Sequence, residues 1–336
     1  MTRRIPAAGL ALFAEARVSY VIGERDDERG LERDSLLAGV RAADVLLSLL
    51  TESVDRDVLE ANGNLRGVAN YAVGFDNIDV QAATELGIPV TNTPGVLTEA
   101  TADLTWALLL GIARRIPEAH AYLTTGRYRI WGPNLLLGAD VGTGPDGSPR
   151  TLGIVGYGRI GAAVARRARG FDMRVLAWTP SGRSRVEADE GVEYAELDTL
   201  LGTSDFVSAH VALTTGTRHL IDEPALRLMR PSAYLINTSR GEVVDERALV
   251  RALKQEWIAG AALDVFEREP SIEPGLADCP NAVLVPHIGS ATRATRDRMA
   301  TMAAYGALAH LRGERATHCV NPQVYATSAY RARVRA

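Results

Sequence analysis

Three closely spaced glycines near the middle of the chain constrain its fold more than any other stretch. Gly156, Gly158 and Gly161 have the spacing G-x-G-x-x-G. The apolar run at 151–155 before them predicts a buried strand, and residues 160–168 predict a helix. In such a strand–turn–helix unit the first glycine makes the tight turn, the second admits a pyrophosphate, and the third lets the helix pack closely on the strand. The stretch therefore predicts a dinucleotide-binding site.

The start of this helix completes the predicted phosphate cradle. Arg159 and Ile160 occupy the first turn, where backbone N–H groups have no helical partner and the helix dipole favours an anion. A second strand predicted at 174–178 follows the helix, as a β-α-β unit requires. This context makes the glycine spacing far more specific than it is alone.

Composition excludes several other classes of protein. The chain has 336 residues, 46% of them hydrophobic and 23% charged, which predicts a globular protein long enough for two domains. A net charge of −4 without a basic cluster argues against nucleic acid or an anionic membrane as partner. The apolar run near the N-terminus is only about ten residues long, too short to span a bilayer. Two cysteines, Cys279 and Cys319, suggest neither a disulfide framework nor a metal site, and a cytoplasmic location is expected.

Short apolar runs alternate with helical segments along the chain, which predicts parallel sheets. Helices are expected at 31–41, 98–115 and 291–312. Strands are expected in the first part at 18–22, 45–49, 67–69 and 89–91, and in the second part at 151–155, 174–178, 206–209, 233–237, 259–263 and 282–285. Six strands are the number expected of a complete dinucleotide-binding sheet.

These elements predict an α/β chain with two domains, each built on a doubly wound parallel sheet. A Rossmann-type dinucleotide-binding domain is expected at 96–291. A discontinuous, flavodoxin-like substrate domain is expected at 1–95 and 292–336, with the last helix returning to it.

Three charged side chains follow predicted strands of the dinucleotide domain. Arg240, Glu269 and His287 lie where the carboxyl edge of a parallel sheet binds ligands. Reduction of a 2-oxo acid requires a hydride at C2, a proton for the carbonyl oxygen and a cationic clamp for the carboxylate. His287 can donate the proton, Glu269 can orient its ring and favour its protonated form, and Arg240 can bind the carboxylate. Taken one at a time, each also reads as an ordinary surface arginine, loop acid or packed histidine.

Taken together, these stretches resemble the D-isomer-specific 2-hydroxyacid dehydrogenases, most of all their glyoxylate/hydroxypyruvate reductase branch. The similarity covers nearly the whole chain, in ordered motifs. They are Thr2-Arg3-Arg4-Ile5-Pro6, Val73-Gly74-Phe75-Asp76-Asn77-Ile78-Asp79, the glycine run, Asn237-Thr238-Ser239-Arg240-Gly241, Glu269-Pro270 and Pro286-His287-Ile288-Gly289-Ser290-Ala291-Thr292.

The resemblance implies an enzyme that acts on the CH–OH group of a small 2-hydroxy acid and reversibly reduces glyoxylate or hydroxypyruvate without a metal. It implies that Arg240, Glu269 and His287 are catalytic, and that the N–H groups of Val73 and Gly74 hold the substrate carboxylate. Other implied site residues are Ser290 near the substrate, Asp264 at the nicotinamide carboxamide and Thr238 at the cofactor. The first strand, ending near Pro6, is expected to be nearly missing.

The resemblance also implies a homodimer, in which Trp131 reaches the active site of the neighbouring subunit from an aperiodic arm. Ordinary packing in the subunit interface is the alternative role for this tryptophan.

The segment after the second strand of the dinucleotide domain favours NADP slightly over NAD. An NAD-selective site places an acid there to hold the ribose 2′-hydroxyl, whereas this chain has Thr179. Ser181, Arg183 and Arg185 follow before the first carboxylate, and a 2′-phosphate prefers such donors. The alternative is that both arginines form a solvated turn, and that the site accepts either cofactor.

Two further functions fit the same motifs. One is a dehydrogenase acting on a phosphonate or phosphite, since such a group can occupy the carboxylate clamp. The other is a nucleotide-sensing, corepressor-like binding protein, because relatives of that kind keep the three charged residues. Formate oxidation is disfavoured, because Glu269 supplies an acid where those relatives have an amide.

Overall fold

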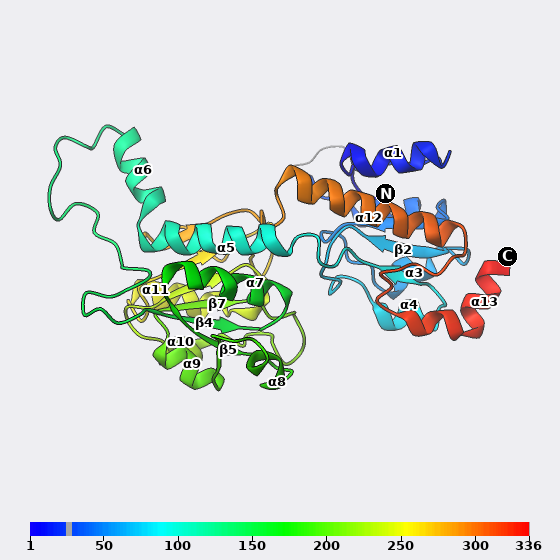
Figure 1. Ribbon diagram of the computed structural model, residues 1–336. Coiled ribbons are helices and arrows are strands. Elements are labelled where there is room, and N and C mark those ends of the chain that lie inside the picture. Colours follow the sequence, from blue (N-terminus) through cyan, green and yellow to red (C-terminus); the bar gives the residue numbers. More distant parts are fainter. Residues whose placement is uncertain (25–28, 336) are drawn as a thin grey trace. The chain divides into compact units, whose positions relative to one another are not determined.

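The computed structural model describes residues 1–24 and 29–335 (Figure 1). The chain forms two compact units, Met1–Leu97 with Ala291–Ala336, and Thr98–Ser290. Each unit contains a parallel sheet with helices packed on both faces, which confirms the predicted α/β class. The two units are called the small-sheet unit and the large-sheet unit below.

The large-sheet unit contains seven parallel strands in the order β10-β9-β8-β7-β4-β5-β6. The six strands expected in this part are confirmed, with ends that shift by one residue at most. The seventh, β6, was missed because it has only two residues. The strands are β4 (Thr151–Val155), β5 (Arg174–Trp178), β6 (Glu193–Tyr194), β7 (Phe206–Ala209), β8 (Tyr234–Asn237), β9 (Gly260–Leu263) and β10 (Ala282–Leu284). The strand order reverses between β4 and β7, which is where such a sheet binds its ligand.

Helices cover both faces of this sheet because its central strands are buried throughout. The long helix α5 packs beside α7 on one face, and α9, α10 and α11 cover the other. The helices of this unit are α5 (Thr98–Ala113), α6 (Ile116–Thr124), α7 (Arg159–Ala168), η1 (Arg169–Phe171), α8 (Ser184–Glu187), α9 (Leu197–Thr203), α10 (Glu223–Leu228), η2 (Gly241–Val243) and α11 (Glu246–Lys254).

An arm leaves the large sheet after α5. It consists of α6, none of whose residues is buried, and the coil that follows it, and Figure 1 shows it extending away from the sheet. The coil exposes 81% of Ile130 and 72% of Trp131. Large apolar side chains left this open are typical of a surface that another protein chain covers.

The small-sheet unit contains three parallel strands in the order β1-β2-β3. They are β1 (Val45–Ser48), β2 (Gly67–Asn70) and β3 (Val90–Thr91), as the sequence predicted. α1 and α12 cover one face of the sheet, and α2, α3 and α4 lie on the other. The helices are α1 (Ala7–Glu15), α2 (Arg33–Arg41), α3 (Arg56–Glu60), α4 (Val80–Glu85), α12 (Arg293–Leu311), η3 (Pro322–Ala326) and α13 (Ser328–Arg335).

The prediction of a strand at 18–22 is wrong. Arg17 adopts a φ of 55°, and the N–H of Val18 donates to the carbonyl of Phe13, so the chain turns back at the end of α1. A strand needs a continuous partner, and the only ladder contact of this region is a single bridge between Arg3 and Glu24 among the described residues. The N–H of Thr2 also donates to Leu47 of β1 at 2.9 Å. The described start of the chain therefore contributes a bridge rather than a strand.

Two findings bear on classes that the composition disfavoured. Within 1–24 and 29–335, no helix has the length and apolar character needed to cross a membrane. In the same residues, no three histidine, cysteine or acidic side chains form a group that could hold a metal ion.

The last long helix buries a histidine against the small sheet. His310 of α12 is 2% exposed, and its ring lies against Gly67, where an added Cβ would approach the ring to 2.3 Å. Its Nε2 lies 3.3 Å from the Thr91 hydroxyl of β3. Burial lowers the pKa of His310 from 6.5 to about 4. The native fold therefore holds this imidazole in its neutral form.

We predict that His310 makes the fold acid-sensitive. Below pH 6.5 the unfolded chain protonates this ring while the folded chain does not, so the stability contributed by neutral His310 falls progressively down to about pH 4. At pH 5 the loss from this group is about 2 kcal/mol. Urea unfolding at pH 7.5 and pH 5 should show a smaller pH dependence in His310→Gln than in wild type. The exposed His120 supplies the control, and an equal effect of His120→Gln would contradict the assignment.

Candidate functional site

The glycine turn connects β4 to α7 with the expected close contacts. Gly156 has a φ of +106°, and its N–H donates to the Trp178 carbonyl at 2.7 Å. A Cβ on Gly156 would lie 2.5 Å from the backbone nitrogen of Val211, and one on Gly161 would lie 2.3 Å from the carbonyl oxygen of Gly156. Both positions therefore require glycine for backbone packing.

The middle glycine differs from the other two. A Cβ on Gly158 would meet no atom of the described residues within 4 Å. Gly158 is the N-cap of α7, and Arg159 and Ile160 begin its first turn without a capping side chain. Free N–H groups beside an open space match the cradle that a pyrophosphate needs, so the residues present fit a dinucleotide.

The segment after β5 contains the residues proposed to select the cofactor. Thr179 is buried, and its hydroxyl lies 3.1 Å from that of Ser181. Arg183 is exposed, forms a 3.7 Å ion pair with Glu187 and lies over the Tyr194 ring, whereas Arg185 is exposed on α8. An incoming 2′-phosphate would therefore compete with Glu187 for Arg183.

A buried tyrosine ties this segment to the glycine turn. Tyr157, between the first two glycines, donates its hydroxyl to the carboxylate of Asp189, which also pairs with Arg169 at 3.1 Å. Burial and this hydrogen bond raise the pKa of Tyr157, so the phenol stays protonated. The phosphate turn and the segment that holds Arg183 and Arg185 are thus connected by side chains as well as by backbone.

A buried aspartate holds the loop that contains His287. Asp264 is 1% exposed, and its two carboxylate oxygens accept the N–H groups of Ile288 at 2.6 Å and Gly289 at 2.8 Å. Its carbonyl accepts the N–H of His287 at 2.9 Å. Burial raises the pKa of Asp264, while these hydrogen bonds and the nearby His287 act against the rise. The loop after β10 is therefore fixed to the end of β9.

His287 and Glu269 form the hydrogen-bonded pair that the sequence suggested. Nδ1 of His287 lies 2.9 Å from Oε2 of Glu269, and the other carboxylate oxygen accepts the Phe266 N–H at 3.0 Å. Burial opposes ionisation of Glu269, but the hydrogen bond and charge of His287, with help from Phe266 and Arg240, lower the pKa of the carboxyl below its ordinary value. His287 has a φ of 51°, in the left-handed region. Its Nε2 has no hydrogen-bond partner among the described residues.

Arg240 lies in the loop after β8. The side chain of Asn237 brackets this loop: its amide donates to the Arg240 carbonyl at 2.8 Å, and its oxygen accepts the N–H of Ser239 at 3.0 Å. Gly241 packs directly against Phe266, because a Cβ there would lie 1.8 Å from its carbonyl carbon. The loops of Arg240 and Glu269 are thus in contact, and three charged residues meet at one edge of the large sheet.

Two other predicted residues of this unit are buried. Thr238 is buried and shares a 2.9 Å hydrogen bond with Thr105 of α5. Ser290 is buried at the end of the His287 loop. Both belong to the carboxyl edge of the sheet, next to the proposed catalytic residues.

The small-sheet unit contains the remaining predicted pair. Val73 and Gly74 lie in the loop after β2, and their N–H groups have no partner within the described residues. Their carbonyls accept hydrogen bonds from the amides of Asn92 and Asn70 respectively. Two adjacent N–H groups without partners are donors of the kind that a carboxylate requires.

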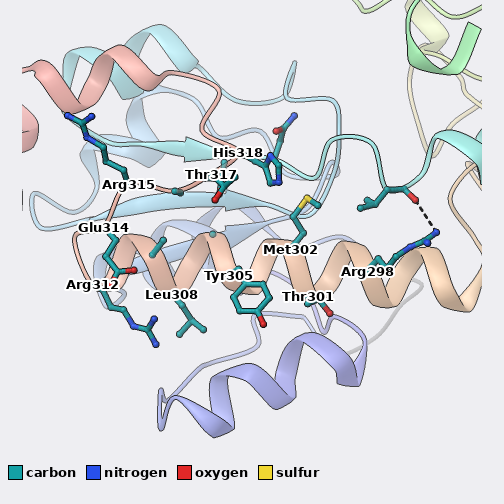
Figure 2. Close-up of a pocket in the computed structure, with 16 residues that line it drawn as sticks. Arg298, Thr301, Met302, Tyr305, Leu308, Arg312, Glu314, Arg315, Thr317 and His318 are labelled. Carbon is teal, nitrogen blue, oxygen red and sulfur yellow. Dashed lines mark hydrogen bonds between the residues drawn. The ribbon is translucent and has the colours of Figure 1, made fainter. Parts of the chain in front are cut away.

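A separate groove of about 570 Å³ lies along α12 in the same unit (Figure 2). Met302, Tyr305 and Leu308 line it, together with His318 and Thr317 from the segment after the helix. It contains none of the residues predicted for the site. Arg298 and Arg315 lie at different ends of the groove, so their charges do not converge on one ligand.

Several residues that shape the site escaped the sequence analysis. The sequence did not indicate that the Asp264 carboxylate anchors the His287 loop, while its expected place at the nicotinamide carboxamide stays a prediction. Glu246 and Glu267 exchange hydrogen bonds, each carboxylate accepting the backbone N–H of the other, which ties α11 to the Glu269 loop. The one available sequence signal was Asn237, whose position two residues before Ser239 is typical of an Asx-turn.

Comparisons with known proteins agree with this geometry. Residues 106–289 match the family described as D-isomer specific 2-hydroxyacid dehydrogenase, NAD binding domain. A glyoxylate reductase of Korarchaeum cryptofilum is 50% identical over 327 residues, covering 96% of each chain.

Solved structures show the same fold over almost the whole chain. A protein from Thermus thermophilus is 42% identical with a TM-score of 0.87, over 95% of this chain and 98% of that one. An NADPH-dependent glyoxylate/hydroxypyruvate reductase from Sinorhizobium meliloti, solved with NADP and malonate, is 32% identical with a TM-score of 0.80, over 96% of this chain and 95% of that one. The chain therefore belongs to the D-isomer specific 2-hydroxyacid dehydrogenase family, whose members are oxidoreductases that use NAD or NADP and act on small 2-oxo and 2-hydroxy acids.

Proposed function

We propose that this protein reduces glyoxylate or hydroxypyruvate to the corresponding 2-hydroxy acid with NAD(P)H. The observation that carries the proposal is the His287–Glu269 pair, which leaves Nε2 of the histidine open at the carboxyl edge of a dinucleotide-type sheet. The names of the relatives and of the structural neighbour support this substrate class.

The residues divide the reaction among themselves. A bound nicotinamide would supply the hydride to C2 of the 2-oxo acid. Arg240 holds the carboxylate and polarises the carbonyl, with the N–H groups of Val73 and Gly74 as further carboxylate donors. His287 gives the proton on Nε2 to the carbonyl oxygen as the hydride arrives, so the alcohol forms neutral, and the ring regains a proton from water.

Glu269 prepares the histidine for this role. Its hydrogen bond to Nδ1 fixes the ring orientation and leaves the opposite nitrogen for the substrate. Its negative charge interacts favourably with a positive charge on the ring, and this interaction lowers the pKa of Glu269. The same pair accepts the proton in the reverse direction.

We propose NADPH as the preferred reductant over NADH. No carboxylate is present at the end of β5, where Thr179 and Ser181 offer hydroxyls, and Arg183 and Arg185 follow. Thr238 and Asp264 are proposed to line the nicotinamide side, and Gly156 to Gly161 the pyrophosphate.

We further propose a homodimer in the cytoplasm. The exposed arm with Ile130 and Trp131 supports a second copy as the partner, with Trp131 close to its neighbour's substrate. Both cysteines are free, as is usual in a reducing compartment.

A substrate panel tests the proposal. Purified protein is supplied with NADPH or NADH and with glyoxylate, hydroxypyruvate, pyruvate or a phosphonate analogue, and absorbance of the reduced cofactor is followed. Turnover of the first two supports the proposal. Turnover of the phosphonate alone, or cofactor binding without turnover of any substrate, overturns it.

Removing the proton donor is predicted to slow the chemical step. His287→Ala should lower kcat by about 10²- to 10⁴-fold, because a general acid acts mainly in the transition state. Arg240→Ala should raise KM as well, since it removes the carboxylate clamp. Steady-state kinetics with glyoxylate measure both, and a near-normal kcat in His287→Ala would assign the acid elsewhere.

Replacing the acid partner is predicted to move the pH profile. Glu269→Gln keeps the shape but removes the charge that favours protonated His287, so reductive activity should fall off at a lower pH than in wild type. The measurement is kcat/KM for glyoxylate across pH 5–9. An unchanged profile would show that Glu269 does not act on the histidine.

The two exposed arginines are predicted to select the cofactor. Arg183→Ala or Arg185→Ala should weaken use of NADPH by about 1–3 kcal/mol, as for a hydrogen bond to a charged group, with little effect on NADH. The readout is kcat/KM for each cofactor. Equal values for both cofactors in wild type, unchanged in both variants, would refute the preference.

The arm is predicted to act across the dimer. Trp131→Ala and His287→Ala should each impair every site of their own homodimers. In a co-expressed heterodimer, the subunit with intact His287 receives an intact Trp131 from its partner, so activity should exceed the mean of the two homodimers. If the activity of the heterodimer does not exceed that mean, Trp131 acts in its own subunit's site or only in interface packing.

A further inference from the structure

The loop after β2 contains three consecutive peptide groups whose carbonyls are all hydrogen-bonded. Three successive carbonyls accept hydrogen bonds: Ala72 from the N–H of Thr93 at 2.9 Å, Val73 from the amide of Asn92 at 2.8 Å, and Gly74 from the amide of Asn70 at 2.7 Å. The donors all belong to residues at or just beyond the ends of β2 and β3. The sheet edge therefore pins one side of three consecutive peptide units.

Pinning the carbonyls determines where the N–H groups point. In a trans peptide the N–H of one residue is opposed to the carbonyl of the residue before it. The only cis peptide among the described residues is Glu269–Pro270, so the loop peptides are trans. The N–H groups of Val73, Gly74 and Phe75 thus point away from the pinned side, and none of the three has a partner in the part of the chain that the structure describes.

A second observation concerns the buried side chains beside this loop. Three buried side-chain oxygens at the ends of the small sheet have no hydrogen-bond partner within the described residues, Ser48 Oγ, Asn70 Oδ1 and Thr93 Oγ1. All three side chains are fully buried. Unpaired buried polar atoms destabilise a fold, and an apolar side chain at 70 would avoid this. The asparagine instead has its amide on the Gly74 carbonyl, so a side chain with an unpaired buried oxygen is the one that holds this loop peptide.

We propose that Asn70 and Asn92 are positioning residues of a three-donor carboxylate site, and that the N–H of Phe75 is its third donor. This inference rests on the proposed function, because the ligand is the carboxylate of the 2-oxo acid. Neither asparagine touches the substrate. They act by fixing the peptide planes of Val73, Gly74 and Phe75, so their loss should weaken substrate binding while leaving the cofactor site intact.

Kinetics and cofactor binding test the positioning role. Asn70→Leu and Asn92→Leu remove the amide donor at nearly constant volume. Each should raise the KM for glyoxylate about tenfold, as expected for the loss of a hydrogen bond that orients a charged ligand, with kcat within threefold and the NADPH Kd unchanged. Asn92 is only half-buried, so its variant carries the test if Asn70→Leu fails to fold.

Asn62 provides a matched control in the same unit. Like Asn70 and Asn92, it donates its amide to backbone carbonyls, but these are the carbonyls of Val40 and Ala43, which lie away from the loop after β2. Asn62→Leu should lower thermal stability without a change in KM. If Asn62→Leu raises KM as much as the other two variants, the effect is general destabilisation and the inference is overturned.

Selective labelling tests the third donor without turnover. The chain has five phenylalanines, so protein labelled with ¹⁵N-phenylalanine gives few amide signals, and the loss of one signal in Phe75→Tyr assigns that residue. Titration of the NADPH-loaded protein with oxalate, an unreactive dicarboxylate, should shift the Phe75 amide more than that of Phe171, and the oxalate Kd should rise about tenfold in Asn92→Leu.

The outcomes separate this inference from the proposed function. If the protein turns over glyoxylate and binds oxalate, but oxalate does not shift the Phe75 amide signal, then Phe75 is not a third donor. If the protein turns over glyoxylate and both asparagine variants have the KM of wild type, only the positioning role of the asparagines is overturned. Absence of both turnover and oxalate binding in wild type overturns the proposed function and this inference with it.

Discussion

The hydrogen bonds of the buried Asp264 carboxylate hold together the carboxyl edge of the large sheet, where the proposed catalytic residues lie. A carboxylate this deeply buried is unfavourable unless donors compensate it, and here the compensation comes from the backbone N–H groups of Ile288 and Gly289. The backbone of the same residue bonds to Asn237 on one side and His287 on the other. Three loops thus take their positions from one residue that need not touch a substrate.

The loops at this edge fix one another's positions through short contacts. Asn237 shapes the Arg240 loop, Gly241 sits against the backbone at Phe266, and the N–H of Phe266 fixes Glu269, which in turn orients His287. Each charged group therefore reaches its place through backbone geometry rather than by attraction alone. A small change in one loop is expected to be felt by all three charged residues.

Most strands of the fold and the edge that holds the proposed site could be predicted from the sequence. Buried parallel strands are continuous apolar runs, and the carboxyl ends of such strands lie at one edge of the sheet. The glycine turn and the pairing of Glu269 with His287 follow from this reasoning. It failed at 18–22, where apolar residues without a strand partner form a turn, and at β6, which is too short to show a pattern. The anchoring role of Asp264 was also out of reach, since its partners lie 24 and 25 residues away and nothing local signals them.

Because of the left-handed backbone at His287, fold stability and turnover favour different residues at this position. Glycine, and to a lesser degree asparagine, adopts that conformation at lower cost than histidine, so selection for a more stable fold alone would favour replacing the residue. Selection for turnover would oppose that change. Heat-resistant variants chosen without an activity screen are therefore at risk of losing the proposed acid, and position 287 is one that a stabilisation campaign should hold constant.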